Sequence, residues 1–148
     1  MKRFFEAKKI AVIGASRNSE KAGRVIFDNL LKNSYLRVFP VNPSASDIGG
    51  QKAYVDVLEI PFPVDLAIIA VKADIIPKIL EQCGEKGVKR AVIISAGFSE
   101  SGNEELTERV KEIIKKYDIK LIGPNVLGII NPYKNFNASF FKEMPEKG

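Results

Sequence analysis

Short apolar runs alternate with amphipathic stretches along the chain, and this alternation predicts strands separated by helices. The runs are rich in Ile, Val and Ala and have the length of strands that are buried on both faces of a sheet. They cover residues 9–14, 36–41, 65–71, 89–94 and 119–122. Because helical patterns separate them, consecutive strands should lie parallel, joined by right-handed crossovers. The pattern predicts an α/β fold with a doubly wound parallel sheet of about five strands.

Apolar positions three and four residues apart predict the helices between these strands. Residues 22–33 and 74–86 each have the pattern of one amphipathic helix, and the clearest helix covers 103–117. The stretch 43–61 contains a Gly-Gly turn and room for at most two helical turns. We therefore expect that crossover to be a short helix flanked by loops.

The length of the chain and the end of its periodicity predict one domain followed by an arm. A chain of 148 residues suffices for a single hydrophobic core. The periodic pattern is lost toward the end of the sequence. We expect residues 1–130 to form the domain and residues 131–148 to be an extended arm outside its core, leading toward a second domain.

Composition excludes several classes of function. The net charge is +5, but the lysines are dispersed and not interleaved with aromatic residues, which argues against nucleic-acid binding. The sequence has no histidine, so histidine metal sites and Ser-His catalysis are excluded within it, and no metal site is predicted. Cys83 is the single cysteine and is expected to be an inert, partly buried thiol. No apolar run approaches the roughly 18 residues of a membrane helix, and no signal region precedes the first strand, so we expect a cytoplasmic chain without membrane contact.

Turns at the carboxyl ends of the strands are the candidate ligand-binding segments, because ligands of doubly wound sheets bind there. Gly14 ends the first strand, but no glycine follows until Gly23, so the dinucleotide fingerprint is absent. Ser16 and Arg17 could bind a diphosphate together with the amides of the next helix, although a plain turn with an exposed arginine is the alternative. Asn42 stands where NAD-binding proteins have an acid, which favours a phosphorylated adenosine over NAD, and it is equally compatible with an Asn-Pro turn.

Six motifs occur in an order that resembles one known family. They are "FPVNP", "GQKAY", "VDLAIIAV", "EQCGEKGVK", "ISAGFSE" and "GPNVLGIINP". Over essentially the whole chain, the sequence resembles the N-terminal, Rossmann-like CoA-binding domain of NDP-forming acyl-CoA synthetases. This is the ADP-forming acetyl-CoA synthetase group, which is related to the succinyl-CoA synthetase alpha subunit. The resemblance implies that coenzyme A is the ligand.

The resemblance also implies roles for individual residues of the strand-end turns. Residues Gly14, Ser16 and Arg17 would contact the CoA diphosphate, and Asn42 and Pro43 would line the adenosine end. Val71 and Lys72 would flank the adenine, Ser95, Ala96 and Gly97 would face the pantetheine arm, and Asn125 would lie near the thiol. Each position could also be an ordinary turn residue.

Departures from the family pattern limit what the resemblance implies. Related chains commonly have a lysine after "VNP" that could pair with the 3'-phosphate, whereas this chain has Ser44, so Lys52 is a possible substitute. Lys72 stands where a proline is usual, and Val126 stands where a cysteine is usual. Because valine has no thiol chemistry, no catalytic residue is assigned.

The family resemblance implies a reversible ligase reaction to which this chain contributes only part of the machinery. Such synthetases interconvert acid, CoA and ATP with acyl-CoA, ADP and phosphate through an acyl phosphate and a phosphorylated histidine. The histidine would belong to a second domain that begins after a "PEKG" stretch like the one at 145–148. We therefore expect phosphohistidine and ATP-grasp domains or subunits as partners. The alternatives are a free-standing CoA-binding module without catalysis and, less favoured, an NAD(P)-binding domain.

Overall fold

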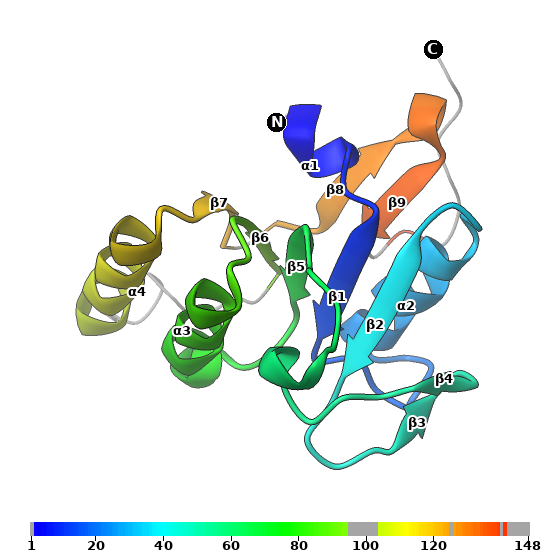
Figure 1. The fold of residues 1–148 in the computed structure, drawn as a ribbon, viewed down its shortest axis with the longest axis horizontal. Coiled ribbons are helices and arrows are strands. Elements are labelled where there is room, and N and C mark those ends of the chain that lie inside the picture. Colours follow the sequence, from blue (N-terminus) through cyan, green and yellow to red (C-terminus); the bar gives the residue numbers. More distant parts are fainter. Residues whose placement is uncertain (1, 95–103, 125, 140, 142–148) are drawn as a thin grey trace.

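The computed structural model describes residues 2–94, 104–124, 126–139 and 141. Among these residues, five parallel strands form the central sheet (Figure 1). In sequence order they are β1 (Lys9–Ile13), β2 (Arg37–Val41), β5 (Leu66–Ile69), β6 (Arg90–Ile93) and β7 (Lys120–Ile122). They lie in the order β2-β1-β5-β6-β7. Each strand falls within one predicted run, so the predicted α/β fold is confirmed.

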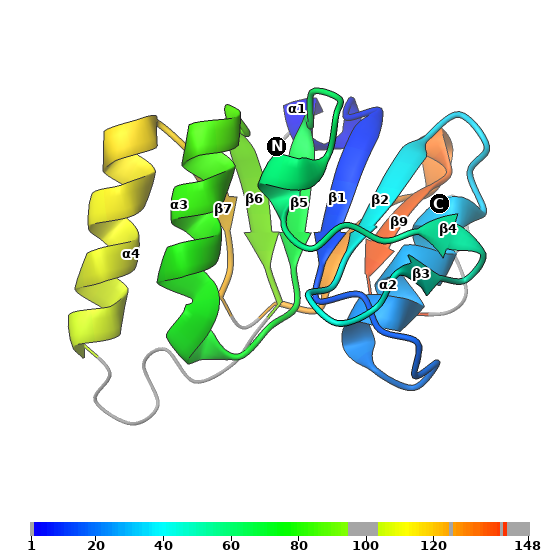
Figure 2. The same cartoon turned by 60° about the horizontal axis from the view of Figure 1, so that its bottom comes forward.

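Helices cover both faces of this sheet (Figures 1 and 2). The short α1 (Lys2–Phe5) and α2 (Ala22–Leu31) pack on one face, while α3 (Ile76–Lys86) and α4 (Glu104–Tyr117) pack on the other. A 3-10 turn, η2 (Ala73–Ile75), leads from β5 into α3. The three predicted helices are confirmed within the described residues.

The core has two layers because every second residue of a strand points to the same face. In β1, Ile10 and Val12 pack toward α2, whereas Ala11 and Ile13 pack toward α3 and α4. All four are buried. A strand that is apolar at every position is therefore required in the middle of the sheet, which explains the continuous apolar runs of the sequence.

The crossover between β2 and β5 differs from the predicted short helix flanked by loops. It contains a two-stranded hairpin, β3 (Asp47–Ile48) and β4 (Gln51–Lys52), closed by the Gly-Gly turn. A single 3-10 turn, η1 (Val57–Glu59), follows. Ile48 is fully buried against the α2 side of the core, and this tertiary contact anchors a hairpin that its short strands could not stabilise alone.

The segment after β7 corrects the prediction of an arm outside the core for residues 131–139. Strands β8 (Gly128–Asn131) and β9 (Phe136–Ser139) form an antiparallel hairpin around the 3-10 turn η3 (Pro132–Lys134). All of β9 is buried, with Phe136 and Ala138 in the core beside α2 (Figure 1). The hydrophobic pattern did not predict this burial because two residues of β9, Asn137 and Ser139, are polar. They can be buried because they hydrogen-bond to each other: the Asn137 side-chain oxygen accepts from the amide of Ser139. The expectation that residues beyond 141 lead to a second domain stays a prediction.

The single cysteine lies inside the core. Cys83 is fully buried in α3, and burial raises the pKa of its thiol to about 12, as an inert thiol requires. Within the described ranges, no group of acidic or cysteine residues could hold a metal ion. Nor does any helix there combine the length and apolar character needed to cross a bilayer.

Candidate functional site

A cleft of about 710 Å³ opens beyond the carboxyl ends of β1, β2 and β5. β1 pairs with β2 on one side and with β5 on the other (Figure 2). The chain therefore adds β2 at one edge of β1 and then crosses back to add β5 at the other edge. This strand order makes the β1/β5 boundary the topological switch point, where doubly wound sheets bind ligands. A cleft is therefore present at the edge of the sheet where the sequence predicts the site.

Loops from both faces of the sheet line the cleft. The lining comprises residues 13–16, 21–23, 41–43, 55–56 and 70–72, together with Ile75, Lys78, Ile79 and Gln82. Six of the predicted site residues are brought together there, namely Gly14, Ser16, Asn42, Pro43, Val71 and Lys72. The lining is mixed, with aliphatic side chains interspersed among polar and charged groups, as is common in small-molecule sites.

Two glycines bring α2 against the end of β1. Gly14 has φ +99° and lies so close to β5 that a Cβ would be 2.2 Å from the carbonyl oxygen of Ala70. A Cβ on Gly23 would be 2.1 Å from the carbonyl oxygen of Gly14. Gly23 thus performs the close helix–strand packing that the third glycine of the dinucleotide fingerprint performs, at a different spacing. Lys21 precedes α2 without capping it by its side chain, and the first two residues of the helix, Ala22 and Gly23, line the cleft.

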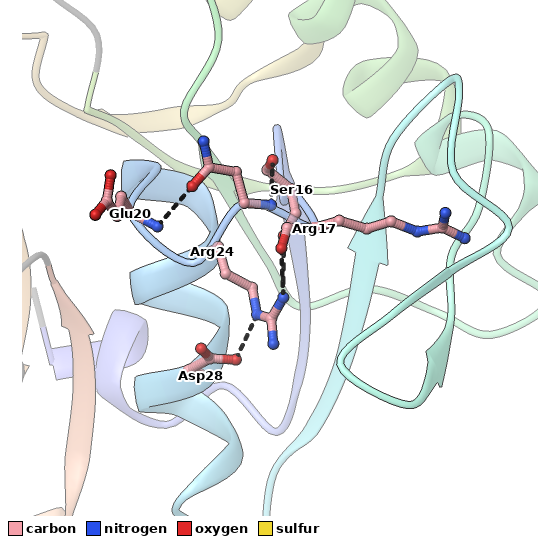
Figure 3. Close-up of polar contacts among 6 residues, drawn as sticks. Ser16, Arg17, Glu20, Arg24 and Asp28 are labelled. Atoms are coloured by element: carbon pink, nitrogen blue, oxygen red, sulfur yellow. Dashed lines mark hydrogen bonds and ion pairs between the residues drawn. The ribbon is translucent and has the colours of Figure 1, made fainter.

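The loop between β1 and α2 is held by hydrogen bonds among its own residues (Figure 3). The Ser16 hydroxyl oxygen accepts from the amide of Asn18 at 3.0 Å, which leaves its O–H free to donate. The Asn18 side chain accepts from the amide of Glu20 at 3.0 Å. Arg24 donates to the carbonyl oxygen of Arg17 at 3.2 Å and pairs with Asp28 on its own helix at 2.8 Å. The loop is therefore preorganised before any ligand arrives.

Arg17, which the sequence predicts to contact a diphosphate, is not among the residues that line the cleft. Its guanidinium extends toward the β3–β4 hairpin (Figure 3) and donates to the Asp47 carboxylate at 2.7 Å and to the Asp47 carbonyl at 3.1 Å. The hairpin, which sequence patterns did not predict, brings Asp47 within reach. Both side chains are about 60% exposed (62% and 61%), so this is a surface ion pair of small energetic weight.

Asn42 lines the cleft, but neighbouring backbone groups use its amide. The side-chain nitrogen donates to the carbonyl oxygen of Ala15 at 2.9 Å. The side-chain oxygen accepts from the amides of Ser44 and Ala45 at 2.8 and 3.1 Å. Asn42 is therefore part of the predicted Asn-Pro turn. Its side chain also joins this turn, which follows β2, to the turn after β1.

Three lysines supply the positive charge among the described lining residues. They are Lys21 before α2, Lys72 after β5 and Lys78 on α3. Sequence analysis missed Lys21 and Lys78, since it considered only the apolar stripe of each helix. Lys52, the possible substitute for a lysine at 44, lies elsewhere: its ammonium is 5.3 Å from the Tyr54 ring centroid, in a separate hollow beside β2 and β4.

Four predicted site residues lie outside the residues that the structure describes. They are Ser95, Ala96, Gly97 and Asn125. Their assignments to the pantetheine and thiol ends of the ligand stay predictions. Gly123, which follows β7, is among the described residues. A Cβ added to Gly123 would lie 2.3 Å from the Ile93 carbonyl oxygen at the end of β6.

A parallel α/β sheet with a cationic cleft at its switch point is typical of nucleotide-binding domains. More particularly, residues 8–132 match the family model described as a CoA binding domain, and the chain belongs to this family. The family resemblance seen in the sequence is thereby confirmed.

Two similar relatives are named as ADP-forming ligases. The chain is 50% identical over 141 residues to an ADP-forming acetate–CoA ligase of Methanocaldococcus jannaschii, matching 95% of this chain and 20% of the ligase. It is 48% identical over 139 residues to the alpha subunit of ADP-forming acetate–CoA ligase II of Pyrococcus furiosus, matching 93% of this chain and 30% of the subunit. The chain thus spans less than a third of the length of either relative.

A solved structure of the same group has the same fold. Acetyl-coenzyme A synthetase 1 of Ca. Korarchaeum cryptofilum, solved in complex with phosphate and ADP, superposes with a TM-score of 0.89 at 39% identity. The match covers 94% of this chain and 30% of that one.

Proposed function

We propose that the cleft binds coenzyme A and that the chain is the CoA-presenting domain of an ADP-forming acyl-CoA ligase. The observation that carries this proposal is the cationic cleft at the β1/β5 switch point of a chain that belongs to the CoA-binding family. The lining suits CoA because basic groups, a hydroxyl donor and helix amides can bind phosphates while aliphatic side chains contact the base.

The diphosphate and the adenosine of CoA have counterparts in the described lining. Ser16 and the first amides of α2 would hold the diphosphate, with Lys21 beside them. Pro43 and Val71 would contact the adenosine, and Asn42 would position the two turns that enclose it. The pantetheine arm would extend toward residues 95–97 and 125. Arg17 is not part of this set, since Asp47 holds its guanidinium outside the cleft.

The proposed role of the chain in the reaction is positional. Bound CoA supplies the thiol that attacks an acyl phosphate, in a reversible reaction that converts acid, CoA and ATP to acyl-CoA, ADP and phosphate. The acyl phosphate and the phosphohistidine would arise on partner domains or subunits, because this sequence has no histidine to phosphorylate. Holding CoA in a fixed orientation replaces an encounter in solution by a local one, which raises the effective concentration of the thiol.

Calorimetric titration of the purified chain with CoA and NAD at one fixed low salt concentration tests the binding step. Saturable binding of CoA without a response to NAD is the expected result. Binding of NAD without CoA would overturn the proposal in favour of an NAD(P)-binding domain.

The ligase role needs a second measurement. ATP-dependent formation of acyl-CoA should appear when the chain is combined with the phosphohistidine and ATP-grasp parts of the enzyme, and should be lost when the chain is omitted. Turnover that does not depend on the chain would favour the free-standing CoA-binding module.

A further inference from the structure

We infer that Lys72 and Lys78 form a second phosphate site in the cleft, which takes the 3'-phosphate on the ribose of CoA. The inference rests on the proposed function and adds to it a specificity for CoA over its dephosphorylated form. The two lysines approach the cleft from the β5–α3 side of the sheet, whereas Lys21 approaches from the α2 side.

The described lining of the cleft includes one carboxylate, that of Asp56, whose Oδ1 accepts from the amide of Glu59 and which is paired with neither Lys72 nor Lys78. Neither ammonium group makes an ion pair with any residue in the described part of the chain. Arginines near the cleft are already committed, Arg17 to Asp47 and Arg24 to Asp28. Lys72 and Lys78 are thus available to an anionic ligand without the loss of an existing ion pair.

The ligand presents more anionic groups than the α2 side can meet. Its diphosphate fits the start of α2, where backbone amides and Lys21 converge. A phosphate monoester on the ribose adds a charge of about −1.5 to −2 near pH 7. A separate cationic group is needed for it, and Lys72 and Lys78 supply one on the opposite wall.

Apolar side chains line the cleft on the same segment as the two lysines and suit the base next to this phosphate. Ile75 and Ile79 line the cleft on the same η2–α3 segment, and Ile75 is 43% exposed. A purine packed on these isoleucines would leave its ribose phosphate on the side of the cleft that carries the two lysines.

The alternative positions for a 3'-phosphate lack these features. After β2, Pro43 and Ser44 bring no cation, and the Asn42 amide is used by backbone groups. Lys52 packs over Tyr54 in another hollow, so it does not line the cleft. Among the described residues, the β5–α3 side is therefore the better-equipped position.

Paired titrations with CoA and dephospho-CoA at fixed low salt test the inference. The wild-type chain should bind CoA more tightly than dephospho-CoA. Lys72→Gln and Lys78→Gln should each weaken CoA binding about three- to tenfold, as expected for loss of one charge-assisted contact at a partly exposed site, with dephospho-CoA affinity nearly unchanged. The charge-preserving Lys78→Arg variant should retain most of the preference for CoA.

Two matched controls remove a lysine elsewhere. Lys115→Gln on α4 and Lys52→Gln on β4 change the net charge equally, and both should leave the CoA preference unchanged. Unchanged dephospho-CoA affinity in the Lys72 and Lys78 variants also demonstrates that these variants are folded.

The outcomes separate the inference from the proposed function. If the wild-type chain binds neither ligand, the proposed function fails and the inference with it. If the wild-type chain binds both ligands equally, or the Lys72 and Lys78 variants keep the preference, the inference is overturned while CoA binding stands. Loss of the preference in Lys52→Gln would also overturn it, as would an equal loss of both ligands in the Lys72 and Lys78 variants.

Discussion

Gly23 lies against Gly14 so closely that a Cβ on Gly23 would be 2.1 Å from the Gly14 carbonyl oxygen. This contact brings the first turn of α2 to the end of β1 and thereby sets one wall of the cleft. Gly23→Ala should therefore separate helix and strand, lowering the free energy of unfolding by about 1–3 kcal/mol, the usual cost of overpacking. It should also weaken CoA binding. Urea unfolding and calorimetry measure the two effects.

The control for this prediction is Gly50→Ala. Gly50 has φ +79° but no atom within 4 Å of an added Cβ, and it lies in the β3–β4 turn away from the cleft. The change should cost about 1 kcal/mol of stability through the left-handed backbone alone and should leave CoA affinity unchanged. Equal loss of CoA affinity in both variants would contradict the proposed role of the Gly14–Gly23 contact.

Asn29 connects α2 to the end of the described chain. Its side-chain nitrogen donates to the carbonyl oxygens of Ser139 and Phe141 at 2.9 and 2.8 Å, and the residue is buried. Asn29→Asp should lower the free energy of unfolding by about 2–4 kcal/mol, because it replaces a buried double donor by a carboxylate that faces two carbonyl oxygens. Asn18→Asp, an exposed position, serves as the control in urea titrations. A change below 1 kcal/mol at Asn29 would mean that the contact with β9 contributes little.

Arg17 should contribute little to CoA binding, because its guanidinium is held by Asp47 outside the cleft. Arg17→Ala is expected to change CoA affinity less than about threefold, within the range of exposed ion pairs. Ser16→Ala should weaken binding more strongly, since it removes a hydroxyl that lines the cleft. Calorimetric titrations compare the two variants, and a tenfold loss in Arg17→Ala would show that the guanidinium leaves Asp47 to reach the ligand.

Cys83 should make stability fall at alkaline pH. Burial raises the pKa of its thiol from 9.0 to about 12, so the folded chain keeps a proton that the unfolded chain releases. The corresponding contribution to stability is complete below pH 9 and is lost progressively as the pH rises toward 12. Urea unfolding of the wild type and Cys83→Ala at pH 8 and pH 10 isolates this effect, because other titrating groups are common to both proteins. Identical pH dependence in the two proteins would refute the prediction.

Accessibility of the same thiol gives an independent check. Since Cys83 is fully buried, an aromatic disulfide reagent at pH 8 should label it only as fast as the chain opens. Complete labelling at the rate of a free thiol would show that α3 does not protect it.

The sequence by itself determined the sheet, its parallel direction and the edge at which the cleft opens. Consecutive residues such as Ile10 and Ala11 are apolar because both faces of β1 are covered. A run of apolar residues can be recognised in the sequence without knowing which elements pack against the strand. The motif order also indicated the family. Gly14, Ser16, Asn42 and Lys72 were found because they follow the ends of predicted strands.

Only the tertiary structure decided which side chains enter the cleft and which segments complete the core. Lys78 lines the cleft because of how α3 packs on the sheet, and Arg17 lies outside it, paired with Asp47 of the β3–β4 hairpin. Strand β9 is buried against α2, where the Asn29 side chain donates to the carbonyl oxygen of Ser139, a residue 110 positions later in the sequence. Periodicity reports local burial averaged over a few residues, whereas these outcomes depend on contacts between residues far apart in sequence.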